Sequence, residues 1–224
     1  MADEVLYEAR DAIGYVTFNR PQARNALTFA MYERLAEVAA EPGDVRALVV
    51  SGAGDRAFAA GTDIGQFRTF GGAEDAIAYE ARLDRVLSTL ERCRVPTIAA
   101  IAGACTGGGA GIAAACDLRI AAANARFGFP IARTLGNCLS MGNIARLAAL
   151  IGAGRVTEMI FTARLLDAEE ARSAGLVSEV LPDARALARR AAELANLVAS
   201  HAPLTLRATK EALRRLRDSL PPDE

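Results

Sequence analysis

The sequence predicts an α/β fold in which crossover helices cover a largely parallel sheet. Two continuous apolar runs, residues 46–52 and 97–101, have the composition of strands that are buried on both faces. Each run leads to a turn rich in glycine and alanine, and a long helical pattern over residues 73–93 lies between them. This alternation of strand, turn, helix and strand is typical of parallel sheets with helical connections.

The N-terminal elements are predicted from strand composition and from a capping signal. Residues 5–10 and 15–19 are rich in strand-forming residues and are separated by residues 11–14, which predicts a hairpin. Thr28 precedes apolar residues at helical spacing, so it is expected to cap a helix that extends through Ala40.

Two short strands and a series of helices complete the predicted fold. Residues 118–122 and 125–128 have strand composition, and the chain after Leu139 is mostly helical in pattern. Asp167 has capping-box spacing, and the helix that it opens is followed by a short apolar stretch at residues 176–180. The later helices are expected at residues 167–175, 183–200 and 203–216.

The domain organisation is expected to be one core with an appendage. Residues 1–200 form the predicted core, and residues 201–224 are the start of a C-terminal helical region. The last six residues are polar and contain two prolines, as a turn between helices does, so this region is expected to be truncated.

Composition excludes several classes of partner. The 224 residues are 52% hydrophobic and 24% charged with a net charge of -1, so no basic field attracts nucleic acid. The N-terminus is acidic and is not followed by the apolar run of a signal peptide. We therefore expect a cytoplasmic protein without a membrane segment.

The cysteines and the single histidine do not indicate a metal site. Cys93, Cys105, Cys116 and Cys138 are scattered without a C-x-x-C pair, and they are expected to be reduced core residues. His201 has no nucleophile near it in sequence, so a structural or solvent role is expected for it.

Two turns carry the strongest functional signal. Residues 57–63 and 103–111 consist mostly of small residues and are expected to present unpaired backbone N–H groups at the starts of helices. Two such turns can hold one anionic oxygen, which is what the enolate of a thioester carbonyl requires. The sequence thus indicates acyl-thioester chemistry.

A nucleotide-dependent dehydrogenase is an alternative interpretation of the first turn. Residues 52–57 match G-x-G-x-x-A after a buried strand. That fingerprint requires a helix that starts at the turn and an acidic residue at the end of the next strand. Residues 59–62 interrupt the expected helix, and Glu74 and Asp75 fall in a helical stretch, so this alternative is disfavoured.

A family resemblance supports the thioester interpretation. The segments that carry it are residues 19–27, 45–52, 57–63, 95–103, 116–117, 127–128 and 174–177. Taken in this order, they resemble the crotonase, or enoyl-CoA hydratase/isomerase, superfamily. The resemblance implies a spiral of ββα units with a helical C-terminal region, assembled as a homotrimer or a dimer of trimers. It also implies an acyl-CoA substrate, with no cofactor other than the coenzyme A of that substrate.

The resemblance also implies a set of site residues. The backbone N–H groups of Thr62 and Gly108 would form the oxyanion hole, and Arg24 and Ala26 belong to the loop that lies along the adenine and ribose of coenzyme A. The other implied substrate-binding residues are Ala60, Gly61, Asp63, Ile64, Gly107, Gly111, Ile131 and Arg133.

The catalytic residues of the family are not matched. Hydratases of this family use two glutamates, and the corresponding places here hold Gly111 and Ile131. The loss of a general acid or base typically costs roughly 10²–10⁴ in rate, so efficient hydration by that route is not expected. The expected activity is that of a lyase or isomerase of the family.

Two alternatives follow from this absence. One is a malonyl-type CoA decarboxylase, in which Arg133 orients the departing carboxylate and no base is needed. The other is a non-catalytic homologue that binds acyl-CoA. Cys138 as a nucleophile is disfavoured because it has no histidine partner, and Asp63 and Asp117 are expected to be turn and cap residues.

Overall fold

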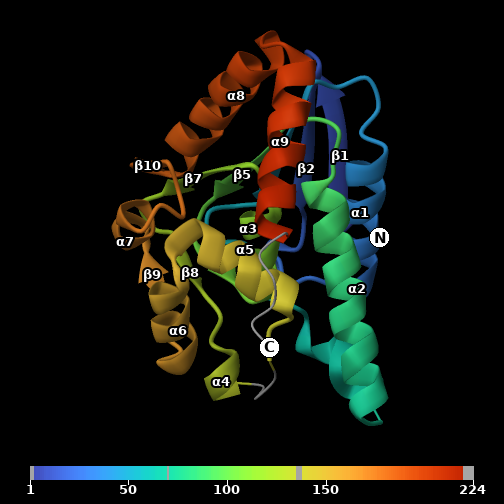
Figure 1. Cartoon of the computed structure of the whole chain (residues 1–224), viewed down its shortest axis with the longest axis vertical. Helices are drawn as coiled ribbons and strands as arrows, with labels where there is room; N and C mark the ends of the chain where they lie inside the picture. Colours follow the sequence, from blue (N-terminus) through green and yellow to red (C-terminus); the bar gives the residue numbers. More distant parts are fainter. Residues whose placement is uncertain (1–2, 70, 135–137, 219–224) are drawn as a thin grey trace.

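The computed structural model describes residues 3–69, 71–134 and 138–218, and its strands, singly or in pairs, are interspersed with helices (Figure 1). The strands are β1 (Val5–Arg10), β2 (Ile13–Phe18), β3 (Ala47–Gly52), β4 (Ala57–Ala59), β5 (Thr97–Ile101), β6 (Ala104–Thr106), β7 (Leu118–Ala122), β8 (Arg126–Gly128), β9 (Leu166–Asp167) and β10 (Glu179–Leu181). The helices are α1 (Phe29–Ala40), α2 (Ala73–Glu91), α3 (Gly108–Ala115), α4 (Ile131–Thr134), α5 (Met141–Ile151), α6 (Ala153–Phe161), α7 (Ala168–Ser173), α8 (Ala184–Ser200) and α9 (Pro203–Asp218), with 3-10 helices η1 (Pro21–Ala23) and η2 (Ile64–Thr69).

The main sheet has six strands in the order β1-β2-β3-β5-β7-β10. Only the β1–β2 pair in this sheet is antiparallel, and the other neighbours run parallel. The two strands predicted from the longest apolar runs, β3 and β5, are adjacent at the centre. The predicted α/β class with a largely parallel sheet is therefore confirmed.

The central strands are apolar on both faces because helices cover both faces. In β3, Ala47 and Val49 join a core cluster that includes Leu187 and Ala191 of α8. The alternate residues Leu48 and Val50 belong to the larger core that α1, α2 and α3 share. The period of two along the strand thus divides its side chains between two hydrophobic layers.

A second, four-stranded sheet has the order β4-β6-β8-β9, and of its strands the sequence pattern predicted β8 alone, at residues 125–128. Strands β4 and β6 are each three residues long, too short for a periodic pattern to emerge. The two amide-rich turns contain these strands, so the turns belong to the edge of this small sheet.

The fingerprint at residues 52–57 leads into β4 and not into a helix, which makes the dehydrogenase alternative wrong. A dinucleotide fingerprint needs a helix N-terminus directly after its glycines, to hold the pyrophosphate. Here Gly54 has a φ of 78° and the chain re-enters an extended strand at Ala57.

The predicted caps and the hairpin are present, with a change in the length of the hairpin loop. The side chains of Thr28 and Asp167 accept N–H groups at the starts of α1 and α7, as predicted. Asp183, predicted as the first residue of a helix, caps α8 in the same way. The hairpin loop is shorter than expected, because Asp11 and Ala12 both adopt positive φ and let β2 begin two residues earlier than predicted. The apolar stretch at residues 176–180 leads into strand β10, which covers Glu179–Leu181.

Glycines allow α3 to approach the small sheet closely. A Cβ on Gly109 would lie 2.3 Å from the Ala59 carbonyl oxygen, whereas a Cβ on Gly111 would lie 3.3 Å from Leu87 Cδ1. The first neighbour is backbone and cannot yield, while the second is the end of a flexible side chain.

Substitution of these two glycines should therefore give different results. Gly109→Ala is expected to lower the free energy of unfolding by about 1–3 kcal/mol through overpacking. In Gly111→Ala the close contact with Leu87 is offset because alanine favours a helix over glycine by about 1 kcal/mol. The free energy of unfolding of this variant should therefore change little. Urea denaturation of both variants checks this, and equal stabilities would contradict it.

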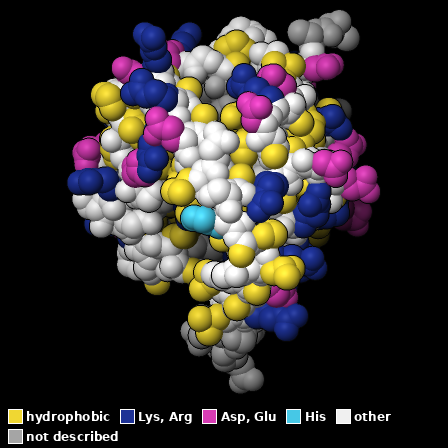
Figure 2. All heavy atoms as spheres, turned by 90° about the horizontal axis from the view of Figure 1, so that it is seen from above, with side chains coloured by type: hydrophobic (Ala, Val, Ile, Leu, Met, Phe, Trp, Pro, Cys, Tyr) yellow, Lys and Arg dark blue, Asp and Glu magenta, His cyan; other side chains and the backbone are white. Residues whose placement is uncertain are grey.

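Charged side chains of both signs are interspersed on the face seen in Figure 2, with apolar side chains between them. That face carries no extended field of one sign. Of the helices in the described part of the chain, none combines the length and apolarity needed to cross a bilayer.

Candidate functional site

The two amide-rich turns lie in contact with each other. Strands β4 and β6 are parallel neighbours, so their carboxyl ends meet at one edge of the small sheet. A Cβ built on Gly107 would lie 3.5 Å from Gly61 Cα, and a Cβ on Gly108 would lie 3.4 Å from Thr62 Oγ1. A methyl group added to either glycine would thus be in van der Waals contact with the other turn.

Pairing with the loop before α1 fixes the direction of the Thr62 peptide. The Leu27 N–H donates to the Gly61 carbonyl at 2.8 Å, and the Asp63 N–H donates to the Leu27 carbonyl at 2.9 Å. Since N–H groups alternate in direction along an extended segment, the Thr62 N–H between them points away from Leu27.

The Gly108 N–H is available because Gly108 is the first residue of α3. The first four N–H groups of a helix have no partner within it, and the earliest helical bond here is from the Gly111 N–H to the Gly107 carbonyl, at 3.0 Å. Within residues 3–69, 71–134 and 138–218, neither Gly108 nor Thr62 donates its N–H to a backbone carbonyl.

Both residues line one pocket of about 220 Å³. The pocket brings together eight of the residues implied by the resemblance: Ala60, Gly61, Thr62, Ile64, Gly107, Gly108, Gly111 and Ile131. Apolar side chains from α2 and from the segment after β8 form much of the remaining wall, including Leu83 and Phe129. Ile64 is 72% exposed and stands where the pocket meets solvent.

Two tyrosines hold the Thr62 hydroxyl. Thr62 Oγ1 lies 2.8 Å from the Tyr32 hydroxyl and 2.6 Å from the Tyr79 hydroxyl. Burial raises the pKa of Tyr32 well above its ordinary value and also raises the pKa of Tyr79, so both phenols stay protonated at neutral pH. The Tyr32 hydroxyl also packs on Gly108, where an added Cβ would lie only 1.8 Å away. This chain of hydroxyl groups therefore fixes both turns.

Arg24 and Ala26 do not line the pocket, but their backbone supports its wall. The Arg24 carbonyl accepts the Ala60 N–H at 3.1 Å, and the Ala26 carbonyl accepts Arg20 Nη1 at 2.7 Å. Between them, the buried amide of Asn25 donates to the Ala57 carbonyl at 2.7 Å. The loop is thereby tied to the first turn.

Asp63 and Arg133 also lie outside the pocket lining. The Asp63 carboxylate pairs with Arg20 at 2.8 Å and accepts the Gly65 N–H at 2.9 Å, and the hydrogen bond from Arg20 lowers its pKa. This agrees with a turn role for Asp63. Arg133 is exposed on the short helix α4.

Sequence reasoning missed the polar residues that α1, α2 and α5 bring to the site. Tyr79, Glu80 and Asn143 line the pocket, and Tyr32 lies behind Thr62. A usable signal was present at Glu80, because it falls three residues before Leu83 and seven before Leu87 on the helix stripe that faces the core.

The cysteines and the histidine take no part in this pocket. Cys93, Cys105 and Cys116 are buried, and desolvation raises the pKa of all three thiols. Cys138 is exposed, which corrects the expectation of a core position for it. The exposed His201 ends α8, and its carbonyl accepts Arg46 Nη2 at 2.9 Å. In the described residues no cluster of metal-ligating side chains occurs.

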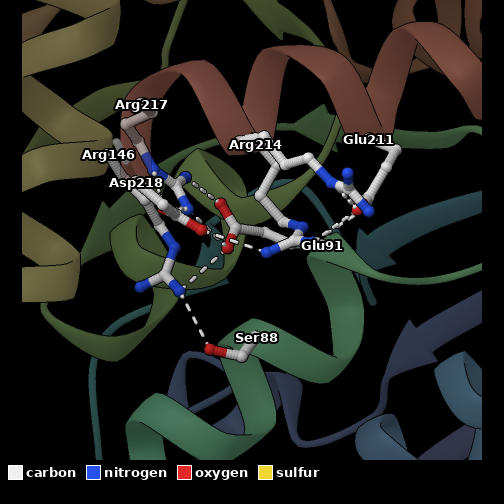
Figure 3. Close-up of polar contacts among 8 residues, drawn as sticks. Ser88, Glu91, Arg146, Glu211, Arg214, Arg217 and Asp218 are labelled. Carbon is white, nitrogen blue, oxygen red and sulfur yellow. Dashed lines mark hydrogen bonds and ion pairs between the residues drawn. The ribbon is translucent and has the colours of Figure 1, made fainter. Parts of the chain in front are cut away.

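A larger cavity, of about 680 Å³, lies beneath α9 and contains neither turn. Its charged groups are engaged with one another (Figure 3): Glu91 of α2 accepts Arg146 Nη2 of α5 at 2.9 Å and also pairs with Arg217 of α9. Burial raises the pKa of Glu91, but the two guanidinium groups outweigh this effect and its pKa is lowered overall. The network therefore holds three helices together.

The fold and the paired turns define an α/β protein of the crotonase type, and comparison with known proteins agrees. The model of the enoyl-CoA hydratase/isomerase family matches residues 8–221. The chain therefore belongs to the enoyl-CoA hydratase/isomerase family of acyl-CoA enzymes.

Individual relatives cover nearly all of the chain. It is 36% identical over 216 residues to the short-chain-enoyl-CoA hydratase of Clostridium acetobutylicum, covering 95% of this chain and 82% of that protein. It is 34% identical to the 2,3-dehydroadipyl-CoA hydratase of Escherichia coli, covering 96% of this chain and 83% of that protein. The crystal structure of an enoyl-CoA hydratase/carnithine racemase from Magnetospirillum magneticum matches with a TM-score of 0.90 and 35% identity, over 100% of this chain and 85% of that one.

Proposed function

We propose that this protein binds an acyl-CoA thioester and stabilises its enolate with the backbone N–H groups of Thr62 and Gly108. The observation that carries the proposal is the contact of the two turns at one pocket, each with an N–H that is not used in the backbone ladders. Two preorganised donors aimed at a developing oxyanion are worth several kcal/mol in an active site. In this proposal Ile64, at the mouth of the pocket, packs on the substrate near its thioester.

Hydration by the two-glutamate route of the family is not part of this proposal, because Gly111 and Ile131 stand at the places that the resemblance assigns to the glutamates. Neither side chain can transfer a proton. Among the family's reactions, those that need only an enolate and few proton transfers fit this pocket best. We also propose that the loop of Arg24 and Ala26 contacts the nucleotide part of coenzyme A.

Calorimetry with two matched ligands tests the binding. Butyryl-CoA has a thioester carbonyl, and S-butyl-CoA, a thioether, lacks it. Only the carbonyl oxygen of butyryl-CoA can therefore accept hydrogen bonds from the two N–H groups. At about 0.5–1.5 kcal/mol for each hydrogen bond, butyryl-CoA is expected to bind about 10-fold more tightly. Equal affinities would contradict an oxyanion hole at this place.

Turnover distinguishes the possible activities. The protein is incubated with but-3-enoyl-CoA, crotonyl-CoA and methylmalonyl-CoA, and products are followed by NMR. Conversion of but-3-enoyl-CoA supports enolate chemistry, whereas loss of carbon dioxide from methylmalonyl-CoA identifies a decarboxylase. Tight binding of all three without conversion would mean a non-catalytic acyl-CoA-binding protein and would refute the enzymatic proposal.

A further inference from the structure

Glu80 occupies a position on α2 where an apolar residue is expected. Leu83, Leu87 and Leu90 form the buried stripe of this helix, and Glu80 precedes them by three, seven and ten residues. Residues at such spacing share one helix face. A carboxylate on a core-facing stripe is costly, so its presence there indicates a function.

The pocket receives the Glu80 side chain beside the two turns. Glu80 lines it together with Thr62 and Gly108, and one of its carboxylate oxygens is buried from solvent. In the described part of the chain, it is the single carboxylate that lines this pocket.

The charge of Glu80 also acts on the hydroxyl groups that fix the turns. Burial is the main reason for the raised pKa of Tyr32 and of Tyr79, and the nearby Glu80 charge raises both further. Both tyrosines contact the Thr62 hydroxyl. The carboxylate is therefore within electrostatic reach of the proposed oxyanion hole.

We propose that Glu80 is the catalytic acid/base of this site, and that it moves a proton between C2 and C4 of a 3-enoyl-CoA thioester. The carboxylate removes a C2 proton, and the C–H electron pair forms a C1=C2 bond while the carbonyl pair moves to the oxygen held by Thr62 and Gly108. The oxygen pair then returns, the double bond moves from C3=C4 to C2=C3, and Glu80 gives the proton to C4. No water or other reactant is consumed.

The charge balance of the pocket favours this step. When Glu80 takes the proton it becomes neutral as the thioester oxygen becomes negative, so the pocket holds one negative charge throughout. The charge only moves from a carboxylate to an oxygen that faces two N–H donors. One carboxylate suffices for such a shift, and the apolar wall formed by Leu83, Phe129 and Ile131 disfavours an attacking water.

This inference rests on the proposed function, and a matched pair of variants separates the two. Glu80→Gln removes the base with little change of shape, and Glu74→Gln makes the same change at an exposed position in the first turn of α2. The measurements are exchange of the C2 protons of butyryl-CoA in deuterium oxide, conversion of but-3-enoyl-CoA to crotonyl-CoA, and the affinity for butyryl-CoA by calorimetry.

Glu80→Gln is expected to slow exchange and conversion by roughly 10²–10⁴-fold and to leave affinity within about 3-fold. Glu74→Gln should match the wild type in all three. Glu80→Asp keeps a carboxylate but shortens the side chain by one methylene, so it should exchange faster than Glu80→Gln and more slowly than the wild type. If the glutamine variant fails to fold, this slowing relative to the wild type tests the base.

The outcomes identify which idea fails. If Glu80→Gln and Glu80→Asp both exchange at the wild-type rate, Glu80 is not the base, although the proposed enolate chemistry stands. If the wild type binds butyryl-CoA but neither exchanges its protons nor converts but-3-enoyl-CoA, the enzymatic proposal fails and this inference fails with it.

Discussion

Gly108→Pro in a Tyr32→Phe background is expected to reduce thioester turnover by roughly 10²–10³-fold relative to Gly108→Ala in the same background. Both substitutions add a Cβ at residue 108, but only proline removes the N–H. The comparison therefore separates the replacement of the N–H hydrogen by the proline Cδ from the effect of the added Cβ.

The Tyr32→Phe change is needed because the Tyr32 hydroxyl lies 1.8 Å from where any Cβ on Gly108 would stand. Without the hydroxyl, the nearest ring atom is Cζ at 3.1 Å, a contact that a small movement of the ring relieves. The Thr62 hydroxyl keeps its 2.6 Å contact with Tyr79.

Proline is tolerated in the first turn of a helix, so α3 should form in both double variants. Circular dichroism and urea denaturation serve as the folding control. Equal kcat/KM for the alanine and proline variants would show that the Gly108 N–H does not hold the substrate oxygen.

The second large effect concerns stability. Glu91→Gln is expected to lower the free energy of unfolding by about 3 kcal/mol, because it leaves two cations in the interior without their anion. Arg146 is 4% exposed and Glu91 is 12% exposed, so water replaces little of the lost interaction. Helix α9 has no buried residue and is held partly through Arg217, so it should lose protection from hydrogen exchange first (Figure 3).

The matched control is Glu33→Gln. Glu33 is 37% exposed and pairs with Arg85 at 2.7 Å on the surface, where such a pair contributes about 0–1 kcal/mol. Urea denaturation of both variants at neutral pH makes the comparison. A loss in Glu91→Gln no larger than in Glu33→Gln would show that the buried network does not stabilise the fold.

The pH dependence follows from the lowered pKa of Glu91. A carboxyl group whose pKa is lower in the folded protein than its ordinary value of 4.5 contributes stability that is fully present above that value. The contribution is lost as pH falls through the folded pKa. The difference between wild type and Glu91→Gln should thus be constant from pH 7 to about 5 and shrink at lower pH.

Local patterns were sufficient for the main sheet and for the helix starts. Strands β3 and β5 could be predicted from their own apolar runs, without reference to the strands beside them. A strand that is buried on both faces is apolar at nearly every position, so the run itself indicates it. The caps at Thr28 and Asp167 are equally local, because each side chain bonds an N–H three residues further on.

The three-residue strands β4 and β6 could not be predicted in the same way. Their pairing depends on contacts between residues more than forty positions apart, such as Ala57 with Ala104. The mutual contact of the two turns depends on that pairing, so the sequence could indicate amide-rich turns but not their meeting.

The sequence by itself determined the α/β class, the family and the two turns with spare N–H groups. Each of these features depends on residues that are adjacent in the sequence or form a short motif. Tertiary structure alone decided that Glu80 and Tyr79 of α2 enter the pocket while Arg133 stays in solvent. The physical reason is that a helix face acquires its environment only when it packs, and the packing of α2 against α1 and α3 turns this face toward the turns.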